Sequence, residues 1–442
     1  MSNELARVEK ALEERGPGRM VPDKERITAL LDLLGNPQRA YPSVHLTGTN
    51  GKTSTARMVD ALLRAFGLRV GRYTSPHLDS ITERIGVDGQ PLSAEKFVEA
   101  YDDVAPYAEF LDSRGGDPLT YFELTTAIAF AAFAETPVDV AVVEVGLGGE
   151  WDATNVLEAP VAVVTPIALD HTGLLGETVG EIATEKAGII HSGATLVSAV
   201  QPVEAAEPLL RRASEVGATV AREGLEFGVV ARDVAVGGQM LTLQGLGGVY
   251  EDVFLPLHGA HQAQNAALAL AAVEAFLGGG ADRSIDIDAV REGFAQVSSP
   301  GRLERVRSSP TVLLDAAHNP AGMRALAEAL TEAFSFGRLV AVVAVLDDKD
   351  ARSMLEVLEP VADAVVITRN SSPRSIDPDA LAALAVEVFG AERVDVAPRF
   401  DDAIEAAFQL AEEDADGPLS SQGVLVTGSV VTVADARRLL KR

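Results

Sequence analysis

The sequence contains no cysteine, which excludes a disulfide framework, a thiolate metal site and a cysteine nucleophile. A metal ion would therefore need oxygen or imidazole ligands. Basic residues are also scarce, since 37 lysines and arginines against 65 aspartates and glutamates leave a net charge of -28. This charge repels nucleic acid and anionic lipid at long range, so we expect neither as a partner.

Long hydrophobic runs are missing as well. The most apolar stretches, such as AIAFAAFA at Ala127–Ala134, are much shorter than the roughly 20 residues that cross a bilayer. The amino terminus, MSNELARVEKALEERG, is charged throughout and contains no apolar segment of the kind that a secretory signal needs. We therefore expect a soluble, cytoplasmic and monomeric protein without a membrane partner.

What the sequence does contain is a repeated alternation of short β-branched runs and helical segments. At 442 residues the chain is too long for one compact domain, so we expect two. In residues 1–298 the runs indicate a doubly wound, mostly parallel sheet with helices on both faces. The expected strands are Ser43–Thr47, Leu68–Tyr73, Val138–Val145, Pro160–Thr165 and Ala194–Val200.

Two changes of texture follow along the chain. At residues 218–257 short alternating segments with many glycines predict a small antiparallel meander attached to the first domain. A proline and a glycine in SSPGR, Ser298–Arg302, interrupt the pattern, and we place the domain boundary there. Residues 299–442 alternate again, which predicts a second, Rossmann-like α/β domain. The fold class expected for both domains is α/β.

The stretch HLTGTNGKTS carries part of a phosphate-loop signature. Its GKT matches the end of GxxxxGK[ST], but Leu46 occupies the position of the first glycine. A strand ending near Thr47, a glycine-containing loop and a helix starting at Lys52 still give the context in which backbone amides bind an anion. We expect Lys52 to reach the outer phosphates and the Thr53 hydroxyl to lie near Mg²⁺. The alternative is a tight turn with a solvated lysine.

Three other polar residues follow predicted strands. Ser75 lies in TSPHL, Glu144 in EVGLGG and His171 in ALDH. Ligands bind at the carboxyl ends of strands in an open parallel sheet, so topology brings these residues towards the phosphate loop, where their oxygen and imidazole groups suit Mg²⁺. Taken singly, Ser75 could be a turn residue, Glu144 an ion-pair partner and His171 a helix cap or core histidine.

The motifs together resemble a known family. In chain order they are TGTNGKTS, TSPHL, TYFE, EVGLGG, DATN, ALDH, EKAG, QNAALAL, SPGRLE, DAAHNP, DKD and VTGS. This series resembles the ATP-dependent Mur ligase superfamily, and within it the folylpolyglutamate synthase and dihydrofolate synthase branch. The resemblance implies that ATP phosphorylates a carboxylate of dihydropteroate or of tetrahydrofolate polyglutamates, and that L-glutamate attacks the acyl phosphate to form an amide.

The resemblance also implies roles for particular residues. Those that would bind ATP are Thr49, Asn50, Gly51, Lys52, Thr53, Asn265, Arg302 and Asp315. Those that would bind Mg²⁺, in two ions, are Ser75, Glu144, His171 and Lys186, the last as a carbamate. Lys52, His171 and Lys186 would take part in catalysis. Because Arg302 lies at the domain boundary, ATP would bridge the two domains.

Two substrate sites follow in the same way. The pterin or folate would contact Thr120, Tyr121, Phe122, Glu123, Trp151, Asp152 and Ala153, together with Val21–Asp23. His318 and Ser429 would hold the incoming glutamate. For Tyr121 and Phe122, packing of a helix against the sheet remains an alternative.

The sequence departs from the family at one position, because Glu150 follows GLGG where a basic residue is usual. We expect the change Glu150→Arg to alter the KM of the substrate more than the affinity for ATP. Two other functions stay open: a Mur-type ligase for a cell-wall peptide precursor, and a nucleotide-binding switch that hydrolyses ATP without an acceptor.

Overall fold

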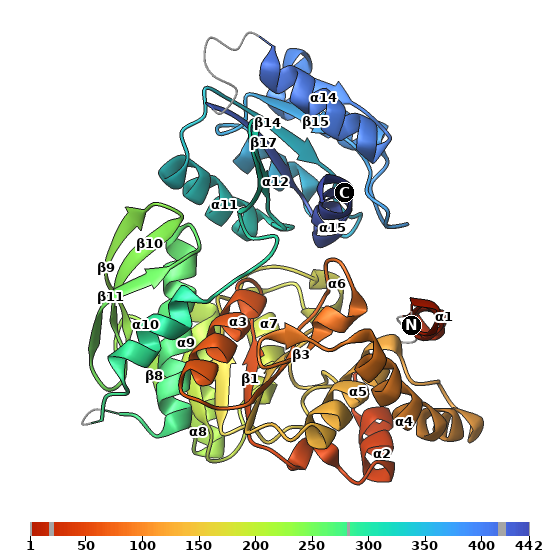
Figure 1. Cartoon of the computed structure of the whole chain (residues 1–442), viewed down its shortest axis with the longest axis vertical. Coiled ribbons are helices and arrows are strands. Elements are labelled where there is room, and N and C mark those ends of the chain that lie inside the picture. The colour runs from red at the N-terminus through yellow and green to blue at the C-terminus, as the bar shows by residue number, and fades with distance from the viewer. Residues whose placement is uncertain (1, 17–21, 281–282, 414–420, 442) are drawn as a thin grey trace. The chain divides into compact units, whose positions relative to one another are not determined.

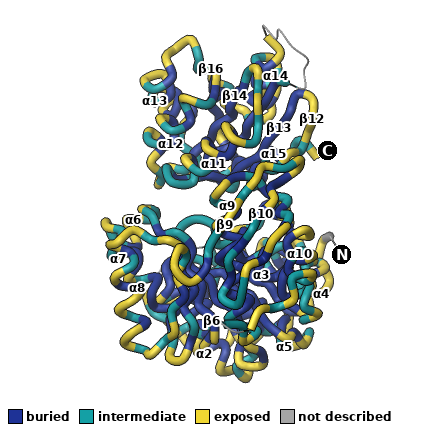
Figure 2. The backbone as a smooth tube through the Cα atoms, turned by 90° about the vertical axis from the view of Figure 1, so that its left-hand side faces the viewer, coloured by how far each residue is buried: buried dark blue, intermediate teal, exposed yellow. Residues whose placement is uncertain are grey.

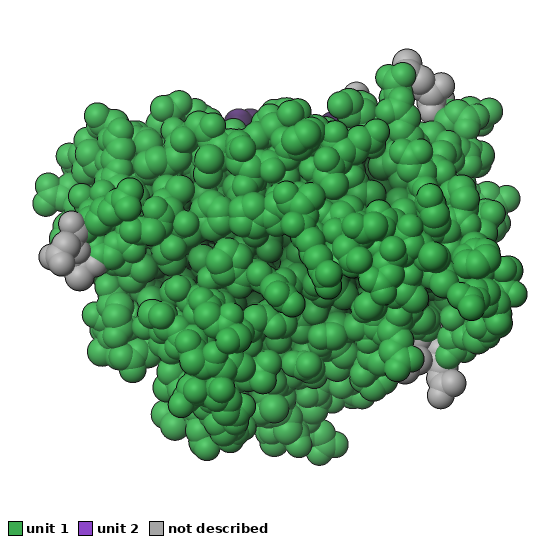
Figure 3. All heavy atoms as spheres, turned by 90° about the horizontal axis from the view of Figure 1, so that it is seen from below, with its two compact units in different colours: residues 1–232, 240–255, 263–297 green, residues 233–239, 256–262, 298–442 purple. Residues whose placement is uncertain are grey.

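The computed structural model describes residues 2–16, 22–280, 283–413 and 421–441. The chain divides into two compact units, coloured separately in Figure 3. Unit 1 comprises Met1–Arg232, Met240–Leu255 and Ala263–Val297, and unit 2 comprises Asp233–Gln239, Pro256–Gln262 and Ser298–Arg442. The main division of the chain therefore falls at Ser298, and two short segments near the small sheet group with unit 2.

Unit 1 is built on an eight-stranded sheet with the order β4-β3-β2-β5-β1-β6-β7-β8. The parallel strands are β2, β5, β1, β6, β7 and β8. At the other edge, β3 is antiparallel to β2, and β4 is antiparallel to β3. Their bounds are β1 Ser43–Thr47, β2 Val70–Tyr73, β3 Ile85–Val87, β4 Gln90–Pro91, β5 Val140–Glu144, β6 Val161–Val164, β7 Thr195–Ser198 and β8 Thr219–Arg222.

Helices surround this sheet in Figure 1. They are α1 Ser2–Arg15, α2 Glu25–Leu33, α3 Lys52–Ala65, α4 Ala94–Ser113, α5 Tyr121–Glu135, α6 Thr172–Leu175, α7 Val179–Lys186, α8 Val203–Val216, α9 Ala260–Leu277 and α10 Ile287–Ala295, with short 3-10 turns at Pro37–Arg39, Ile81–Arg84 and Ala187–Ile189. Figure 2 shows buried strands and helices with exposed outer faces. Along β5, alternate residues Ala141 and Val143 pack in one core with α5, as the period of two in a strand requires.

The small antiparallel sheet is shorter than the sequence indicated. It has the order β11-β10-β9, with β9 at Gly228–Ala235, β10 at Gly238–Gln244 and β11 at Val249–Leu255. The prediction began this meander at residue 218, but β8 pairs in parallel with β7 and so extends the large sheet. Alternating polarity identified a strand in β8 correctly but could not identify its partner.

Unit 2 contains a six-stranded sheet with the order β12-β13-β17-β14-β15-β16. Only β12 is antiparallel to its neighbour, so this α/β sheet is mostly parallel. Its elements are β12 Glu304–Ser308, β13 Thr311–Leu314, α11 Pro320–Ala333, β14 Arg338–Val343, α12 Ala351–Leu358, β15 Ala364–Ile367, α13 Pro378–Phe389, a 3-10 turn at Ala391–Arg393, β16 Val394–Val396, α14 Phe400–Glu412, β17 Gln422–Thr427 and α15 Val430–Leu440. The predicted α/β fold class is confirmed, and within the described ranges no helix is long and apolar enough to cross a membrane.

A buried ion pair joins α3 to β2 beneath the phosphate loop. Arg72 Nη1 lies 2.5 Å from Asp60 Oδ2, and both side chains are at most 5% exposed. Arg64 Nε lies 3.2 Å from the other carboxylate oxygen. Removing the charge of one partner leaves the other buried without full compensation, which is costly in the low-dielectric interior.

We therefore expect Asp60→Asn to lower the free energy of unfolding by about 3 kcal/mol. The matched control is Glu207→Gln, which removes an exposed pair with Arg211 at 3.8 Å and should cost less than about 0.5 kcal/mol. Urea unfolding of both variants measures this, and equal losses would contradict a structural role for the buried pair.

Candidate active site

The phosphate loop connects β1 to α3 through two glycines with left-handed backbone conformations. Gly48 and Gly51 have φ angles of 142° and 91°. A Cβ atom on Gly48 would lie 1.9 Å from Thr165 Oγ1, and one on Gly51 would lie 2.6 Å from Asn265 Oδ1. The loop therefore packs closely against the end of β6 and against α9, where Asn265 lies beside Gly51.

Hydrogen bonds fix the shape of this loop. Lys52 Nζ donates to the carbonyl oxygens of Gly48 and Thr49, at 2.9 and 3.1 Å. Thr49 Oγ1 donates to Ala168 O at 3.0 Å, and the Thr49 backbone N–H donates to Pro166 O at 3.0 Å. The segment after β6 thus holds the loop at the amino terminus of α3, where amides and helix dipole favour an anion.

Glu144 ends β5 next to the loop and is only 1% exposed. Its two carboxylate oxygens accept hydrogen bonds from Thr53 Oγ1 at 2.9 and 3.0 Å. The backbone N–H of Ser75 donates to the same carboxylate at 3.3 Å. One buried carboxylate therefore contacts both the phosphate loop and the loop after β2.

His171 lies on the other side of β1, in the segment after β6. Its backbone is left-handed, with φ of 50°, and its half-buried imidazole lies 3.9 Å from Asp170 Oδ1 through Nε2. Because β5, β1 and β6 are adjacent and parallel, Glu144, the phosphate loop and His171 share one edge of the sheet.

Lys186 ends α7 and is only 3% exposed. Burial and, to a smaller extent, the positive charge of Lys52 lower the pKa of its amine to about 7, against the opposing effect of Asp170. A large fraction of the amine is therefore neutral, and so nucleophilic, near pH 7. The electrostatic influence of Lys52 and Asp170 also shows that Lys186 belongs to the same edge of the sheet.

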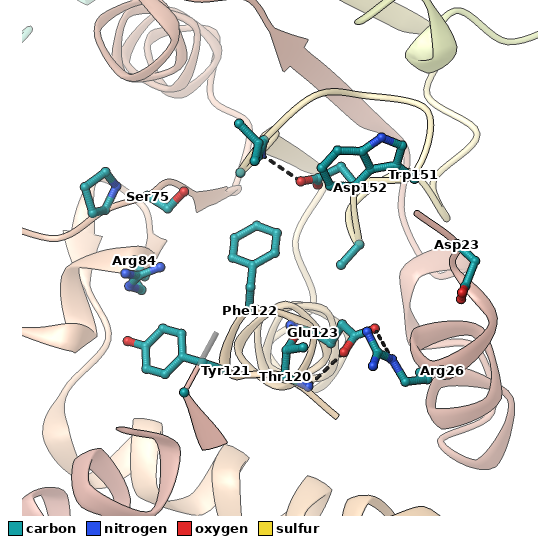
Figure 4. Close-up of a pocket in the computed structure, with 15 residues that line it drawn as sticks. Asp23, Arg26, Ser75, Arg84, Thr120, Tyr121, Phe122, Glu123, Trp151 and Asp152 are labelled. Atoms are coloured by element: carbon teal, nitrogen blue, oxygen red, sulfur yellow. Dashed lines mark hydrogen bonds and ion pairs between the residues drawn. The ribbon is translucent and has the colours of Figure 1, made fainter. Parts of the chain in front are cut away.

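A cavity of about 500 Å³ opens beside this edge. All seven residues expected to bind a pterin line it, namely Thr120, Tyr121, Phe122, Glu123, Trp151, Asp152 and Ala153. In Figure 4 the ring of Phe122 lies centrally, with Ser75 and Arg84 on one side and Trp151 and Asp152 on another. Asp23 also lines the cavity, whereas Val21, predicted with it, is outside the described residues.

Several lining side chains are fixed by their neighbours. Glu123 caps α5 by accepting from the Thr120 backbone N–H at 2.8 Å, and its other oxygen accepts from Arg26 Nε at 3.0 Å. The guanidinium carbon of Arg84 lies 5.1 Å from the ring centroid of Tyr121, a cation–π arrangement. Two positive groups therefore stand in a pocket whose centre is aromatic.

Asp152 is a second buried carboxylate of this pocket besides Glu123, with 3% of its surface exposed. Its oxygens accept from the backbone N–H of Leu147 at 2.9 Å and from the backbone N–H and hydroxyl of Thr154, at 2.9 and 2.5 Å. Burial raises the pKa of the Asp152 carboxyl, and these hydrogen bonds oppose the rise.

The residues predicted in unit 2 lie near strand ends of the six-stranded sheet. Asp315 follows β13 and accepts from the backbone N–H groups of Leu303 and Ala317, both at 2.9 Å. Burial raises the pKa of its carboxyl, and the positive charge of Arg302 opposes this rise. Arg302 and Asp315 thus lie within electrostatic range of one another, as expected for two groups of one site.

His318 and Ser429 differ in their hydrogen-bond partners. His318 Nδ1 lies 2.9 Å from Ala316 O in the turn that follows Asp315. Ser429 is the amino-terminal cap of α15, with its hydroxyl accepting from the Thr432 backbone N–H at 3.0 Å and from Asn370 Nδ2 at 3.1 Å. The Ser429 hydroxyl is therefore committed to local structure.

Comparison with known proteins supplies the family. The chain matches the Mur ligase middle domain over residues 46–273 and the Mur ligase glutamate ligase domain over residues 301–430. A dihydrofolate synthase/folylpolyglutamate synthase of Mycobacterium tuberculosis is 54% identical over 99% of this chain and 94% of its own length. The chain belongs to the folylpolyglutamate and dihydrofolate synthase branch of the Mur ligase family.

Solved structures agree with this placement in the Mur ligase family. Mycobacterium tuberculosis folylpolyglutamate synthase complexed with ADP has a TM-score of 0.96 and 53% identity, covering 100% of this chain and 99% of that one. Escherichia coli FolC in complex with DHPP and ADP has a TM-score of 0.85 and 33% identity, covering 99% and 97%.

Six lining residues of this Mur ligase pocket were not predicted from the sequence, and three of them, Arg26, Arg84 and Gly146, shape it most directly. Arg84 lies in TSPHLDSITER, a polar segment after a strand, and that position was a usable signal. Arg26 lies on α2 and gave no signal, because its place depends on how α2 packs against α5. Gly146 leaves space for the Phe122 ring, since a Cβ atom on Gly146 would lie 2.3 Å from Phe122 Cζ.

The position of Glu150 does not support the substrate contact on which the expectation for Glu150→Arg depended. This residue is exposed and does not line the pocket; its backbone N–H donates to Glu185 O at 2.9 Å, and its side chain lies over Gly188. The turn after GLGG points Trp151 and Asp152 inwards and Glu150 outwards, which the order of residues alone does not reveal.

We expect Gly146→Ala to raise the dissociation constant for a pterin-type ligand such as dihydropteroate about tenfold, because the Phe122 ring must shift. Affinity for ATP should change less than about twofold. Glu150→Arg serves as the control and should leave both affinities within about twofold. Titration calorimetry measures all four constants, and a larger effect of Glu150→Arg than of Gly146→Ala would contradict this site.

Proposed function

We propose that this protein is an ATP-dependent ligase that joins L-glutamate to dihydropteroate and to tetrahydrofolate or its polyglutamates. The observation that carries the proposal is the double role of Ser75. Ser75 lines the pocket, and its backbone N–H donates to the carboxylate of Glu144. The same carboxylate accepts from the hydroxyl of Thr53, next to the phosphate loop. The phosphate site and the acceptor pocket therefore meet at one residue.

The pocket suits this acceptor in size and chemistry. A volume of about 500 Å³ is within the range of small-molecule sites. The pterin N–H groups would meet Asp152, its rings would lie against Phe122, and the carboxylate end would point towards Ser75 and Arg84, which lie on another side of Phe122 in Figure 4. The structure of E. coli FolC in complex with DHPP and ADP supports a site that holds an acceptor and a nucleotide together.

The reaction follows from charge. An oxygen of the acceptor carboxylate attacks the γ-phosphorus of ATP, the bond from that phosphorus to the β-γ bridging oxygen breaks, and ADP leaves. The glutamate amine then attacks the carbonyl carbon of the acyl phosphate, loses a proton, and phosphate departs as the amide forms. Two anions must approach one another in the first step, so Lys52 and the α3 amino terminus would neutralise charge and hold the phosphate in line.

The residues fit Mg²⁺ shared with a nucleotide. Within the described residues no group of three His, Cys, Asp or Glu side chains could hold a metal alone. Mg²⁺ usually takes one or two carboxylates and completes its shell with substrate phosphates and water. The buried Glu144 carboxylate beside the Thr53 hydroxyl matches that donor chemistry, and we assign Glu144, Ser75 and His171 to Mg²⁺. Bound Mg²⁺ would neutralise the charge that develops on the transferring phosphate.

Lys186 would act as a carbamate. Its neutral amine can add CO₂ and lose a proton, which turns a cation into a carboxylate-like ligand for a second Mg²⁺. In unit 2, Arg302 and Asp315 are assigned to ATP and His318 to the incoming glutamate. Ser429 is assigned to glutamate only indirectly, since its hydroxyl anchors α15.

The first test of the ligase is its requirement for both partners. ADP release from purified protein should need dihydropteroate or tetrahydrofolate together with L-glutamate, and should be slow when either is missing. Lys52→Ala should lower this rate at least about a hundredfold, because it removes the cation nearest the phosphates. Coupled measurement of ADP settles this, and release that ignores acceptor and glutamate would identify a nucleotide-hydrolysing switch instead.

The second test concerns the carbamate. The folded pKa of Lys186, about 7, lies below its ordinary value of 10.5, so the neutral amine grows as pH rises through 7. At fixed dissolved CO₂, carbamate occupancy should therefore rise between pH 6 and 8 until the site is saturated, because a higher pH favours both the neutral amine, which gains about tenfold, and the loss of the second proton when CO₂ adds. Carbon-13 NMR after labelling with CO₂ detects the carbamate, and Lys186→Ala is the control. A signal that persists in Lys186→Ala would contradict the assignment.

A further inference from the structure

The strand that leads into the phosphate loop also supports the wall of the pocket. In β1, His45 and Thr47 are two residues apart and therefore point to the same face of the sheet. Thr47 Oγ1 donates to Gly148 O at 2.7 Å, and His45 Nε2 lies 2.8 Å from Thr154 Oγ1. Both contacts reach the loop that carries Asp152.

The direction of the hydrogen bonds that link His45, Thr154 and Asp152 can be deduced from the last acceptor, the Asp152 carboxylate. Thr154 Oγ1 lies 2.5 Å from Asp152 Oδ1. Both oxygens of this carboxylate accept from backbone N–H groups, which favours its charged, accepting form, so the threonine hydroxyl donates its single proton there. The same hydroxyl oxygen must then accept from His45, which requires a proton on Nε2. His45 Nδ1 is buried without a hydrogen-bond partner, as suits the unprotonated nitrogen of that tautomer.

His45 and Thr154 are fully buried. Both are 0% exposed, so bulk water does not compete for the hydrogen bond between them. Burial also lowers the pKa of His45 to about 3, and the imidazole therefore stays neutral under physiological conditions. The relay does not titrate and acts only through geometry.

Asp152 keeps capacity for a ligand. Its oxygens accept from the backbone N–H groups of Leu147 and Thr154 and from the Thr154 hydroxyl. A backbone hydrogen bond from Gly146 also acts on this carboxyl. These bonds set the plane of the carboxylate, and Asp152 lines the pocket, where a ligand donor can share its oxygens.

We propose that His45 is a positioning residue for the acceptor: through Thr154 it orients the Asp152 carboxylate that receives the N–H donors of the pterin ring. The proposal rests on the proposed function for the identity of the acceptor. His45 touches neither substrate nor ATP, so its effect is on acceptor binding, not on phosphate transfer.

The test compares His45→Phe, which keeps a ring and removes the donor, with His45→Gln, whose Nε2 can donate again. His45→Phe should raise the KM for dihydropteroate about five- to tenfold, the worth of one positioning hydrogen bond, with kcat and the KM for ATP within about twofold. His45→Gln should recover the KM to within about threefold of the wild type. The matched control is His191→Phe, which removes a different, partly buried histidine, bonded to Asn155 Oδ1 at 2.8 Å, and should leave the acceptor KM within about twofold.

The proposal is overturned if His45→Phe leaves the KM for dihydropteroate unchanged, if His45→Gln is as impaired as His45→Phe, or if kcat and both KM values change together. Should His45→Phe not fold, Thr154→Val and Thr154→Ser make the same comparison at the next link, with only the serine variant keeping the hydroxyl. Thr154→Val should show the rise in KM, and equal behaviour of the two variants overturns the relay.

Nitrogen-15 NMR of histidine-labelled wild-type protein tests the relay without turnover. His45 should show a protonated Nε2 and an unprotonated Nδ1 that do not change between pH 6 and 8. The opposite tautomer overturns the proposal. Because this measurement needs no acceptor or ATP, its failure is distinct from a failure of the ligase function, which would appear as ADP release independent of dihydropteroate in the wild type.

Discussion

The structure of unit 1 depends on the parallel pairing of β1 with β5 and β6. This pairing is buried on both faces and brings three strand ends to one edge. From that edge come the phosphate loop, Glu144 and His171, and the loop after β5 returns through Trp151 and Asp152 to form the pocket wall. The order of these parallel strands decides which side chains lie close together at the edge of the sheet.

Close backbone approach is the second constraint. Gly48 and Gly51 let the phosphate loop pack against Thr165 and Asn265, and Gly146 leaves room for the ring of Phe122. The phosphate loop could be predicted from the sequence because GKT between an apolar strand and a helix is a local pattern. It did not identify the role of Gly146, because a steric allowance for a distant aromatic ring leaves no local pattern.

The α/β class and the central strands could be predicted from strand periodicity, which is a local feature, whereas the seven residues that line the pocket were implied by the resemblance of contiguous motifs to the family. Strand partners and the direction of turns were harder. The β8 strand was placed in the meander, and Glu150 was placed towards the substrate, because both depend on contacts with residues far away in the chain. The part played by Arg26 depends in the same way on helix packing.

The central claim is that the phosphate loop and the pocket serve one reaction, in which the acceptor carboxylate itself takes the γ-phosphate. Dihydropteroate with oxygen-18 in its carboxylate tests this directly, by mass spectrometry of the phosphate released during ligation with L-glutamate. One labelled oxygen should appear in each phosphate, because the bond between the carbonyl carbon and the attacking oxygen breaks when the amide forms. Unlabelled phosphate released alongside the amide product, with the departing label found in water instead, would contradict the account.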